Sequence, residues 1–149
     1  MICTGYFAKL EEYALHGFQL ISIANTNINK IGKLVIKKFK PLIPGNWIFN
    51  WKNDLKNRND LGRAKIEYVN TYYSKCLSKF TPEDLVKDLL AFSNNHDAIL
   101  LCYEKTPVDT PSNGIVALSQ LEAGTSFCHR HLVSDFLRQA GYECREYIL

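Results

Sequence analysis

Continuous apolar runs alternate along the chain with segments whose apolar residues recur every three to four positions. Runs of the first kind are typical of strands buried in a sheet, and they lie at residues 2–6, 18–24 and 98–103. The helical spacing covers residues 7–16, 63–78, 82–92 and 128–140. We expect a final strand at residues 144–148, a short helix at residues 47–56, and either a strand or an irregular segment at residues 34–39. This order of elements predicts a small three-layer α/β fold with a mainly parallel sheet flanked by helices.

Several helix ends are marked by their local sequence. Thr81-Pro82-Glu83-Asp84 places an N-cap residue, a proline at the first helical position and acids in the first turn, which together favour a helix start. Gly17 and Gly141 follow two of the helical segments, where glycine commonly ends a helix. Asn25 and Asn27 read as turn residues unless a pocket reaches them.

The length favours one domain. A chain of 149 residues is of the usual size for a single folded unit, so we expect one domain over residues 1–149. Residues 105–127 contain two prolines and two glycines and form a long connection for a compact domain. We interpret this segment as a lid or an inserted binding loop.

Composition narrows the cellular setting. No apolar run of the sequence is long enough to span a membrane, and the first residues lack the basic and apolar regions of a secretory signal. The five cysteines are odd in number and show no CxxC spacing, which favours free thiols in a reducing compartment. We therefore expect a cytoplasmic protein that does not engage a membrane.

Charge is unevenly distributed along the chain. Residues 30–65 hold ten basic and two acidic residues, whereas residues 79–149 hold six basic and ten acidic ones. A basic segment attracts phosphates, so nucleic acid is a possible partner. The same pattern also fits a solvated lysine-rich surface, and two tryptophans within it, Trp47 and Trp51, fit either base stacking or core packing.

Two segments carry the candidate chemistry. Leu100-Leu101-Cys102-Tyr103-Glu104 is the exit of the predicted buried strand, and Phe127-Cys128-His129-Arg130-His131 is the first turn of a predicted helix. Because ligand sites of parallel sheets lie at the carboxyl ends of the strands, we expect the two segments to face each other there.

The predicted catalytic residues are Glu104, Cys128 and His129. A thiol at a helix start can have a lowered pKa, and the thiolate is the reactive form. Glu104 would orient an imidazole or carry a proton. The alternative is that Cys128 packs as a small buried residue and the histidines have a structural role.

The predicted ligand-binding residues are Tyr6, Lys9 and Arg130. Arg130 and the first amides of its helix suit an anion, or Arg130 pairs with Glu104 and locks strand to helix. Tyr6 and Lys9 follow the first strand and would sit at the same sheet edge. The alternative is that Lys9 is a plain surface residue and Tyr6 a half-buried one.

Metal ligation is the weaker interpretation of the cysteines and histidines. Cys102, Cys128, His129 and His131 are acceptable zinc ligand types, but their spacing matches no zinc motif. His129 and His131 point apart on a helix. We therefore predict no metal site, and the sequence indicates no particular cofactor.

Four motifs follow one another in a recognisable order. They are Thr4-Gly5-Tyr6-Phe7-Ala8-Lys9-Leu10, Leu42-Ile43-Pro44 with Trp47, Leu100-Leu101-Cys102-Tyr103-Glu104 and Cys128-His129-Arg130. Together they resemble the bacterial and phage family called domain of unknown function 488. The resemblance implies a small α/β domain without an established reaction, and it points to Tyr6, Lys9, Glu104, Cys128, His129 and Arg130. The connection between Glu104 and Cys128 is longer than the short loop of that family.

These observations lead to one leading expectation and two alternatives. We expect an enzyme-like domain with an anion-binding pocket, acting on a nucleotide or nucleic-acid-related substrate through Glu104, Cys128, His129 and Arg130. The phage-like setting of the resembling family suggests that ligand class by analogy. The alternatives are a non-catalytic binding module, such as a nucleotide-signal sponge or a host-interaction protein, and a nucleic-acid-binding protein that uses residues 30–65.

Overall fold

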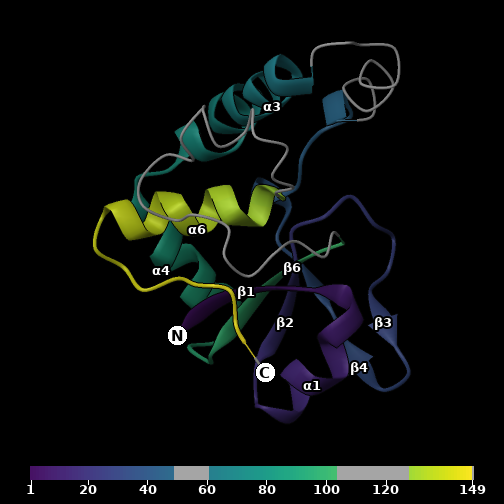
Figure 1. The fold of residues 1–149 in the computed structure, drawn as a ribbon. Helices are drawn as coiled ribbons and strands as arrows, with labels where there is room; N and C mark the ends of the chain where they lie inside the picture. The colour runs from purple at the N-terminus through teal and green to yellow at the C-terminus, as the bar shows by residue number, and fades with distance from the viewer. Residues whose placement is uncertain (49–60, 104–127, 149) are drawn as a thin grey trace.

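A four-stranded parallel sheet forms the centre of the molecule. The computed structural model describes residues 1–48, 61–103 and 128–148, which Figure 1 shows as coloured ribbon. The strand order is β1-β6-β2-β5, and each neighbouring pair is parallel. The strands are β1 (Ile2–Tyr6), β6 (Ala98–Cys102), β2 (Gln19–Ser22) and β5 (Lys37–Lys38). A separate antiparallel pair consists of β3 (Lys30–Ile31) and β4 (Leu34–Val35).

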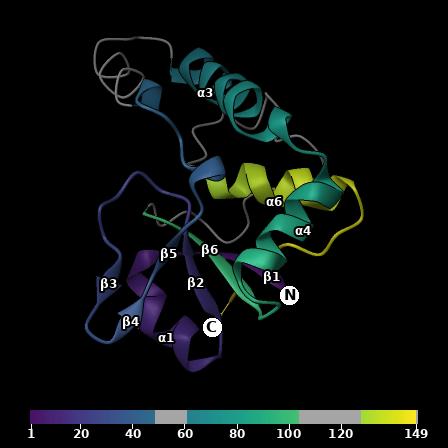
Figure 2. The same cartoon turned by 180° about the vertical axis from the view of Figure 1, so that it is seen from behind.

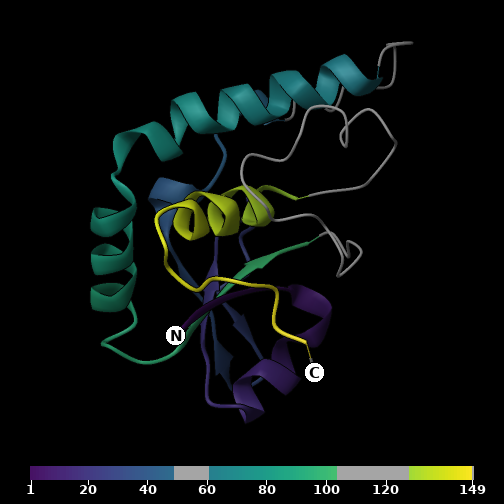
Figure 3. The ribbon, with the colours of Figure 1, turned by 60° about the vertical axis from the view of Figure 1, so that its left-hand side comes forward.

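Helices cover both faces of the sheet, so the predicted small α/β fold is confirmed. Helix α1 (Leu10–Leu15) lies on one face, and α4 (Pro82–Phe92) and α6 (His129–Gln139) lie on the other. Helix α3 (Leu61–Lys75) lies beyond α6, farther from the sheet (Figure 3). Three short 3-10 helices complete the described elements, at Phe7–Lys9, Lys40–Leu42 and Leu77–Lys79.

Local sequence explains where these helices begin and end. The Thr81 hydroxyl accepts a hydrogen bond from the amide of Asp84 at 3.1 Å, and Pro82 is the first helical residue. Gly17 and Gly141 have φ angles of 85° and 89°, a region in which a side chain is strained. The predicted cap and both predicted glycine stops are therefore confirmed.

The sheet separates two apolar cores. Along β6, Ile99 and Leu101 point towards α1, whereas Leu100 and Cys102 point towards α6. This alternation follows from the two-residue period of a strand. A strand that is apolar at every position is therefore buried on both sides, as its continuous run predicts.

Two parts of the predicted secondary structure differ. The segment at residues 34–39 is divided between β4 and β5, which belong to different sheets. The predicted strand at Cys144–Ile148 is wrong, because only Glu146 forms a bridge, to Thr4 of β1. Two backbone hydrogen bonds with Thr4 and the packing of the Tyr147 ring against Phe18, at 4.7 Å between ring centroids, hold this segment beside β1.

The chain leaves the two central strands in opposite directions. After β2 it passes through β3 and β4 to β5, on the side of β2 away from β6. After β6 it continues to α6 and ends beside β1, on the side of β6 away from β2. Figure 2 shows both strands from behind. The carboxyl ends of β2 and β6 therefore flank a topological switch point, where parallel sheets commonly bind ligands.

Some predictions fall on residues that the structure does not describe. The predicted lid at residues 105–127 lies outside the described residues, and so does most of the helix expected at residues 47–56, of which only Trp47 and Ile48 are described as helical. Within the described ranges, no helix is both long and apolar enough to cross a bilayer.

Candidate functional site

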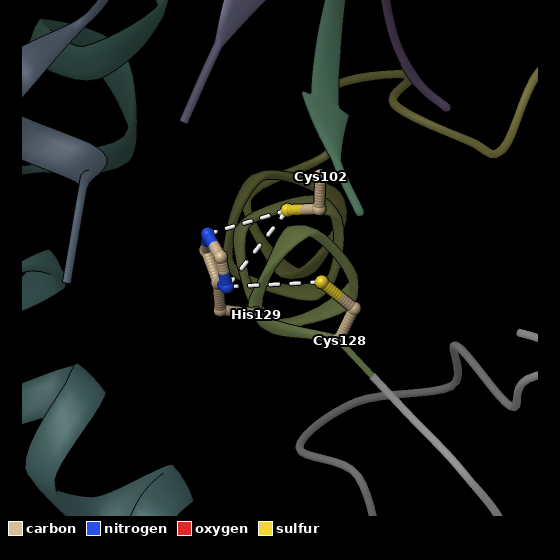
Figure 4. Close-up of side chains that lie close together, drawn as sticks. All are labelled: Cys102, Cys128 and His129. Atoms are coloured by element: carbon tan, nitrogen blue, oxygen red, sulfur yellow. Dashed lines mark hydrogen bonds between the residues drawn. The ribbon is translucent and has the colours of Figure 1, made fainter. Parts of the chain in front are cut away.

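Two thiols and one imidazole meet where β6 ends and α6 begins. Cys102 is the last residue of β6, Cys128 is the N-cap residue of α6 and His129 is its first helical residue. One ligand atom from each residue lies within 4.8 Å of the others, and all three residues are buried. Figure 4 shows His129 facing both sulfurs. We call Cys102, Cys128 and His129 the Cys-Cys-His cluster.

A backbone carbonyl determines how the His129 ring is protonated. The Nε2 atom lies 2.5 Å from the carbonyl oxygen of Ile23, which follows β2. A carbonyl oxygen only accepts hydrogen bonds, so Nε2 carries a proton and donates it. The other nitrogen, Nδ1, lies 3.7 Å from the Cys128 sulfur and 3.2 Å from the Tyr68 hydroxyl oxygen.

The surroundings of Cys128 favour its thiolate. Burial opposes ionisation, but a hydrogen bond from Cys102, the charge and hydrogen bond of His129, and the charge of Arg130 together hold the pKa of Cys128 well below its usual range. The sequence predicts this effect from a helix start and neighbouring cations. The structure adds Cys102, which contributes from the facing strand.

Arg130 makes a two-point ion pair with Glu146. Its Nε lies 3.1 Å from Glu146 Oε2, and its Nη2 lies 3.0 Å from Oε1. The Thr4 hydroxyl donates to the same carboxylate at 2.7 Å. Burial alone would lower the pKa of Arg130, but the hydrogen bonds to Glu146 together with the charges of Cys128, Glu146 and Cys102 outweigh it and raise that pKa. Arg130 thus makes a bidentate pair with Glu146, whereas the pair with Glu104 that the sequence suggests involves a residue outside the described ranges and stays a prediction.

The other predicted ligand-binding residues lie near one another at the end of β1. Tyr6 is half-buried and its ring lies 5.9 Å from the Arg130 guanidinium carbon. Lys9 is 41% exposed and forms an ion pair with Glu12 at 2.9 Å. Tyr6 is therefore part of the surroundings of Arg130, whereas Lys9 has a surface partner one helical turn away.

Glu104 lies outside the described residues, so its predicted place opposite Cys128 stays a prediction. His131 is buried and distinct from the Cys-Cys-His cluster. Burial and the neighbouring charge of Arg130 lower the pKa of His131 to about 4, so its imidazole is neutral at physiological pH.

An open cavity lies at the switch point, beside the Cys-Cys-His cluster. Its volume is about 550 Å³. Its described lining is mostly polar and consists of Ala24, Asn25, Thr26, Asn27, Lys38, Lys40, Ile43 and Tyr103. Two lysines and no acidic residue are among these described lining residues, and we call this space the lysine cavity.

The lysine cavity and the cluster are linked through two strand ends. Ala24 follows Ile23, whose carbonyl holds His129, and Tyr103 follows Cys102. Cys128 and His129 are 3% and 4% exposed and are not part of the cavity lining. The cluster therefore lies behind the cavity wall.

Sequence reasoning missed several residues of this region. Lys38 and Lys40 belong to the basic segment at residues 30–65, but only the fold shows that they reach the switch point. Asn25 and Asn27, interpreted as turn residues, line the same cavity. No sequence pattern identifies Glu146 as the partner of Arg130, since it is a single acidic residue in a short C-terminal segment.

No family model, no curated protein and no solved structure matches this chain. The resemblance to the domain of unknown function 488 therefore stays a prediction. The geometry offers an open cavity lined by two lysines and a separate buried group of two thiols and an imidazole.

Proposed function

We propose that the protein binds a small anionic ligand of nucleotide type in the lysine cavity. The observation that carries this proposal is the position of Lys38 and Lys40 in a cavity at the switch point of a parallel sheet. A volume of about 550 Å³ falls within the range of small-molecule sites.

The lining offers a complementary group for each part of a nucleotide. Lysine ammonium groups bind phosphates as point charges. Asn25 and Asn27 supply amide donors and acceptors, which suit a base edge or a sugar. Tyr103 is 50% exposed, and an exposed aromatic ring is a stacking surface for a base.

Tyr103 is also held in place. Its hydroxyl donates to the Thr26 hydroxyl at 2.6 Å, and its ring lies 4.9 Å from that of Phe7. A ring fixed before the ligand arrives loses little conformational freedom on binding. These contacts support a role for Tyr103 in ligand recognition.

Equilibrium binding to the purified full chain tests the proposal, with ATP, AMP and inorganic phosphate as probes. We expect ATP or AMP to bind, and we expect each of Lys38→Ala and Lys40→Ala to weaken binding about tenfold or more, since a hydrogen bond to a charged group contributes roughly 1.5–3 kcal/mol. Lys75→Ala with Lys79→Ala is the matched control, because both lysines are exposed and lie outside the cavity.

Two outcomes would contradict the proposal. One is that no probe binds the wild-type protein. The other is that the variant lacking both cavity lysines binds as well as the control variant. Binding of an oligonucleotide instead, with an affinity that falls steeply with salt, would favour the nucleic-acid alternative.

Turnover of the ligand by Cys128 and His129 stays a prediction. The lowered pKa of Cys128 supports it, while the cavity wall separates both residues from the lysine cavity. A non-catalytic binding module needs only the cavity, and native mass spectrometry distinguishes the two: a binding module releases its ligand chemically unchanged.

A further inference from the structure

We infer that the Cys-Cys-His cluster is a zinc-binding site. This inference is independent of the ligand in the lysine cavity. It replaces the role of Cys128 as a nucleophile, because a thiolate bound to zinc in a buried site is not free to attack a substrate. It also departs from the expectation of no metal site.

The residue types fit zinc. Two thiolates and one imidazole are three of the ligands found in structural and catalytic zinc sites. The cluster joins elements that are far apart in the sequence, since Cys102 and Cys128 are separated by a long connection. That separation explains why the spacing matches no known motif although the three side chains meet in the fold.

The distances around His129 Nδ1 fit a tetrahedral ion. Nδ1 lies 3.7 Å from the Cys128 sulfur and 3.8 Å from the Cys102 sulfur. With Zn–N near 2.0 Å and Zn–S near 2.3 Å, tetrahedral angles separate the nitrogen and each sulfur by about 3.5 Å. Both Nδ1–sulfur distances are therefore within a few tenths of an ångström of those around one ion. The Cys102 sulfur also lies 3.2 Å from Nε2, whereas a sulfur bound to an ion on Nδ1 would lie about 5 Å from Nε2. Zinc binding therefore requires the Cys102 side chain or the imidazole ring to rotate.

The Ile23 carbonyl decides which nitrogen faces the ion. Nε2 lies closer to the Cys102 sulfur, at 3.2 Å, than Nδ1 does. If Nε2 bound a metal, it would carry no proton. The Ile23 carbonyl oxygen, 2.5 Å away, would then lose its hydrogen-bond donor. A ligating histidine usually donates its other N–H to such a carbonyl, so Nδ1 is the ligand atom.

Tyr68 places a fourth polar group near the Nδ1 atom of His129. Its hydroxyl oxygen lies 3.2 Å from Nδ1, and Tyr68 is buried on α3. A hydroxyl there can donate a hydrogen bond to a thiolate or to a water that completes the coordination of the ion.

Burial indicates a structural rather than a catalytic zinc. The three ligand residues are 0%, 3% and 4% exposed, and closed surroundings are typical of structural sites. An ion here would join the carboxyl end of β6 to the first turn of α6. Both thiols would lose their protons on binding, so affinity would rise with pH.

The metal content of the purified full chain tests the inference. Elemental analysis of protein prepared under reducing conditions should give about one zinc per chain, as for other structural sites. Cys102→Ser and Cys128→Ser should each lose stoichiometric zinc. Cys76→Ser is the matched control, because Cys76 is also buried in the same core but lies outside the cluster, and it should keep the metal.

A second measurement does not depend on how the variants fold. Cobalt added to the metal-free wild-type protein should produce a thiolate-to-cobalt charge-transfer band and the intense visible bands of a tetrahedral site. Zinc at a hundredfold excess over its dissociation constant should raise the melting temperature by about 5–10 °C.

Three results would overturn the inference. They are a wild-type chain that binds neither zinc nor cobalt, a metal retained equally by Cys102→Ser and Cys128→Ser, and a Cys102–Cys128 disulfide in freshly reduced and re-purified protein. All three would leave the lysine cavity proposal untouched, since that proposal involves neither cysteine.

Discussion

Positive charge lies at both sides of the carboxyl edge of the sheet, in two different settings. Beside β1, Arg130 is fully buried and paired at two points with Glu146. Beyond β5, Lys38 and Lys40 line an open cavity and form no ion pair among the described residues. A buried charge must be compensated by the protein itself, whereas a solvated charge is stabilised by water and remains available to a ligand. The difference favours an architectural role for the charge beside β1, and it is consistent with our proposal that the lysines beside β5 bind a ligand.

The largest expected effect comes from Arg130→Ala. It leaves the Glu146 carboxylate without its guanidinium, and breaking a buried pair costs about 3–5 kcal/mol. Urea unfolding measures the loss, with Arg145→Ala as the control because Arg145 is exposed. Equal midpoints for the two variants would show that the pair does not stabilise the fold.

Replacing both partners sharpens that test. Arg130→Met combined with Glu146→Met removes the unpaired charge as well as the pair, and such replacements are often neutral or stabilising. We expect the double variant to recover most of the stability lost in Arg130→Ala. Losses that simply add would argue against a direct interaction.

A smaller loss is expected from Gly5→Ala, which tests how tightly the β1 side is closed. A Cβ at Gly5 would lie 2.7 Å from the ring of Tyr13 on α1. Forcing atoms into a packed core costs about 1–3 kcal/mol. In Gly45→Ala the new Cβ would meet only the Trp47 side chain, at 3.3 Å, so this control should change the urea midpoint less. The reverse order would mean that α1 moves away at little cost.

Asp135 is a buried acidic residue of α6 near the charge of Arg138. It is 1% exposed, and its Oδ1 has no hydrogen-bond partner among the described residues. Burial raises the pKa of Asp135, although hydrogen bonds from Gln139 and Tyr73 and the charge of Arg138 oppose that shift.

The sign of the effect follows from that raised pKa. The folded state holds the Asp135 proton more tightly than the unfolded state. The stability this contributes is present below the unfolded pKa and is lost as pH rises through the folded pKa. Relative to Asp135→Asn, the wild-type protein should therefore lose stability as the pH rises above the ordinary Asp pKa of about 4. Unfolding at several pH values checks this, and parallel pH profiles would contradict it.

The smallest effect on stability is expected on the β5 side. Lys38→Ala and Lys40→Ala remove solvated side chains, and such substitutions usually change stability by no more than about 0.5 kcal/mol each. The same variants should lose nucleotide binding. A large loss of stability would show that these lysines belong to the architecture, like Arg130.

The comparison also shows where sequence reasoning succeeds. The apolar run at Ala98–Cys102 and the Thr81-Pro82 start depend on local physics, namely burial on two faces and the capping of free amides. Both are therefore readable from a few adjacent residues. Cys128 and His129 are found for the same reason, since a helix start is a local signal.

The remaining site residues depend on long-range contacts. Glu146 is joined to Thr4, 142 positions away in the sequence, and no local pattern marks such a pair. Lys38 lies in a strand of two residues, too short for a periodic signal. Their roles follow from the order and direction of the strands. Residue patterns predict the fold class but not this particular order.

The C-terminal segment also protects the rim of the sheet. β1 is the outermost strand, and the Thr4 amide donates to the Arg145 carbonyl while the Tyr147 amide donates to the Thr4 carbonyl, both at 2.9 Å. An uncovered strand rim invites pairing with another molecule. The ion pair between Glu146 and Arg130 holds the C-terminal segment against β1. Loss of the Arg130–Glu146 pair would therefore expose the free edge of β1 and promote self-association of the protein, even while the rest of the sheet stays intact.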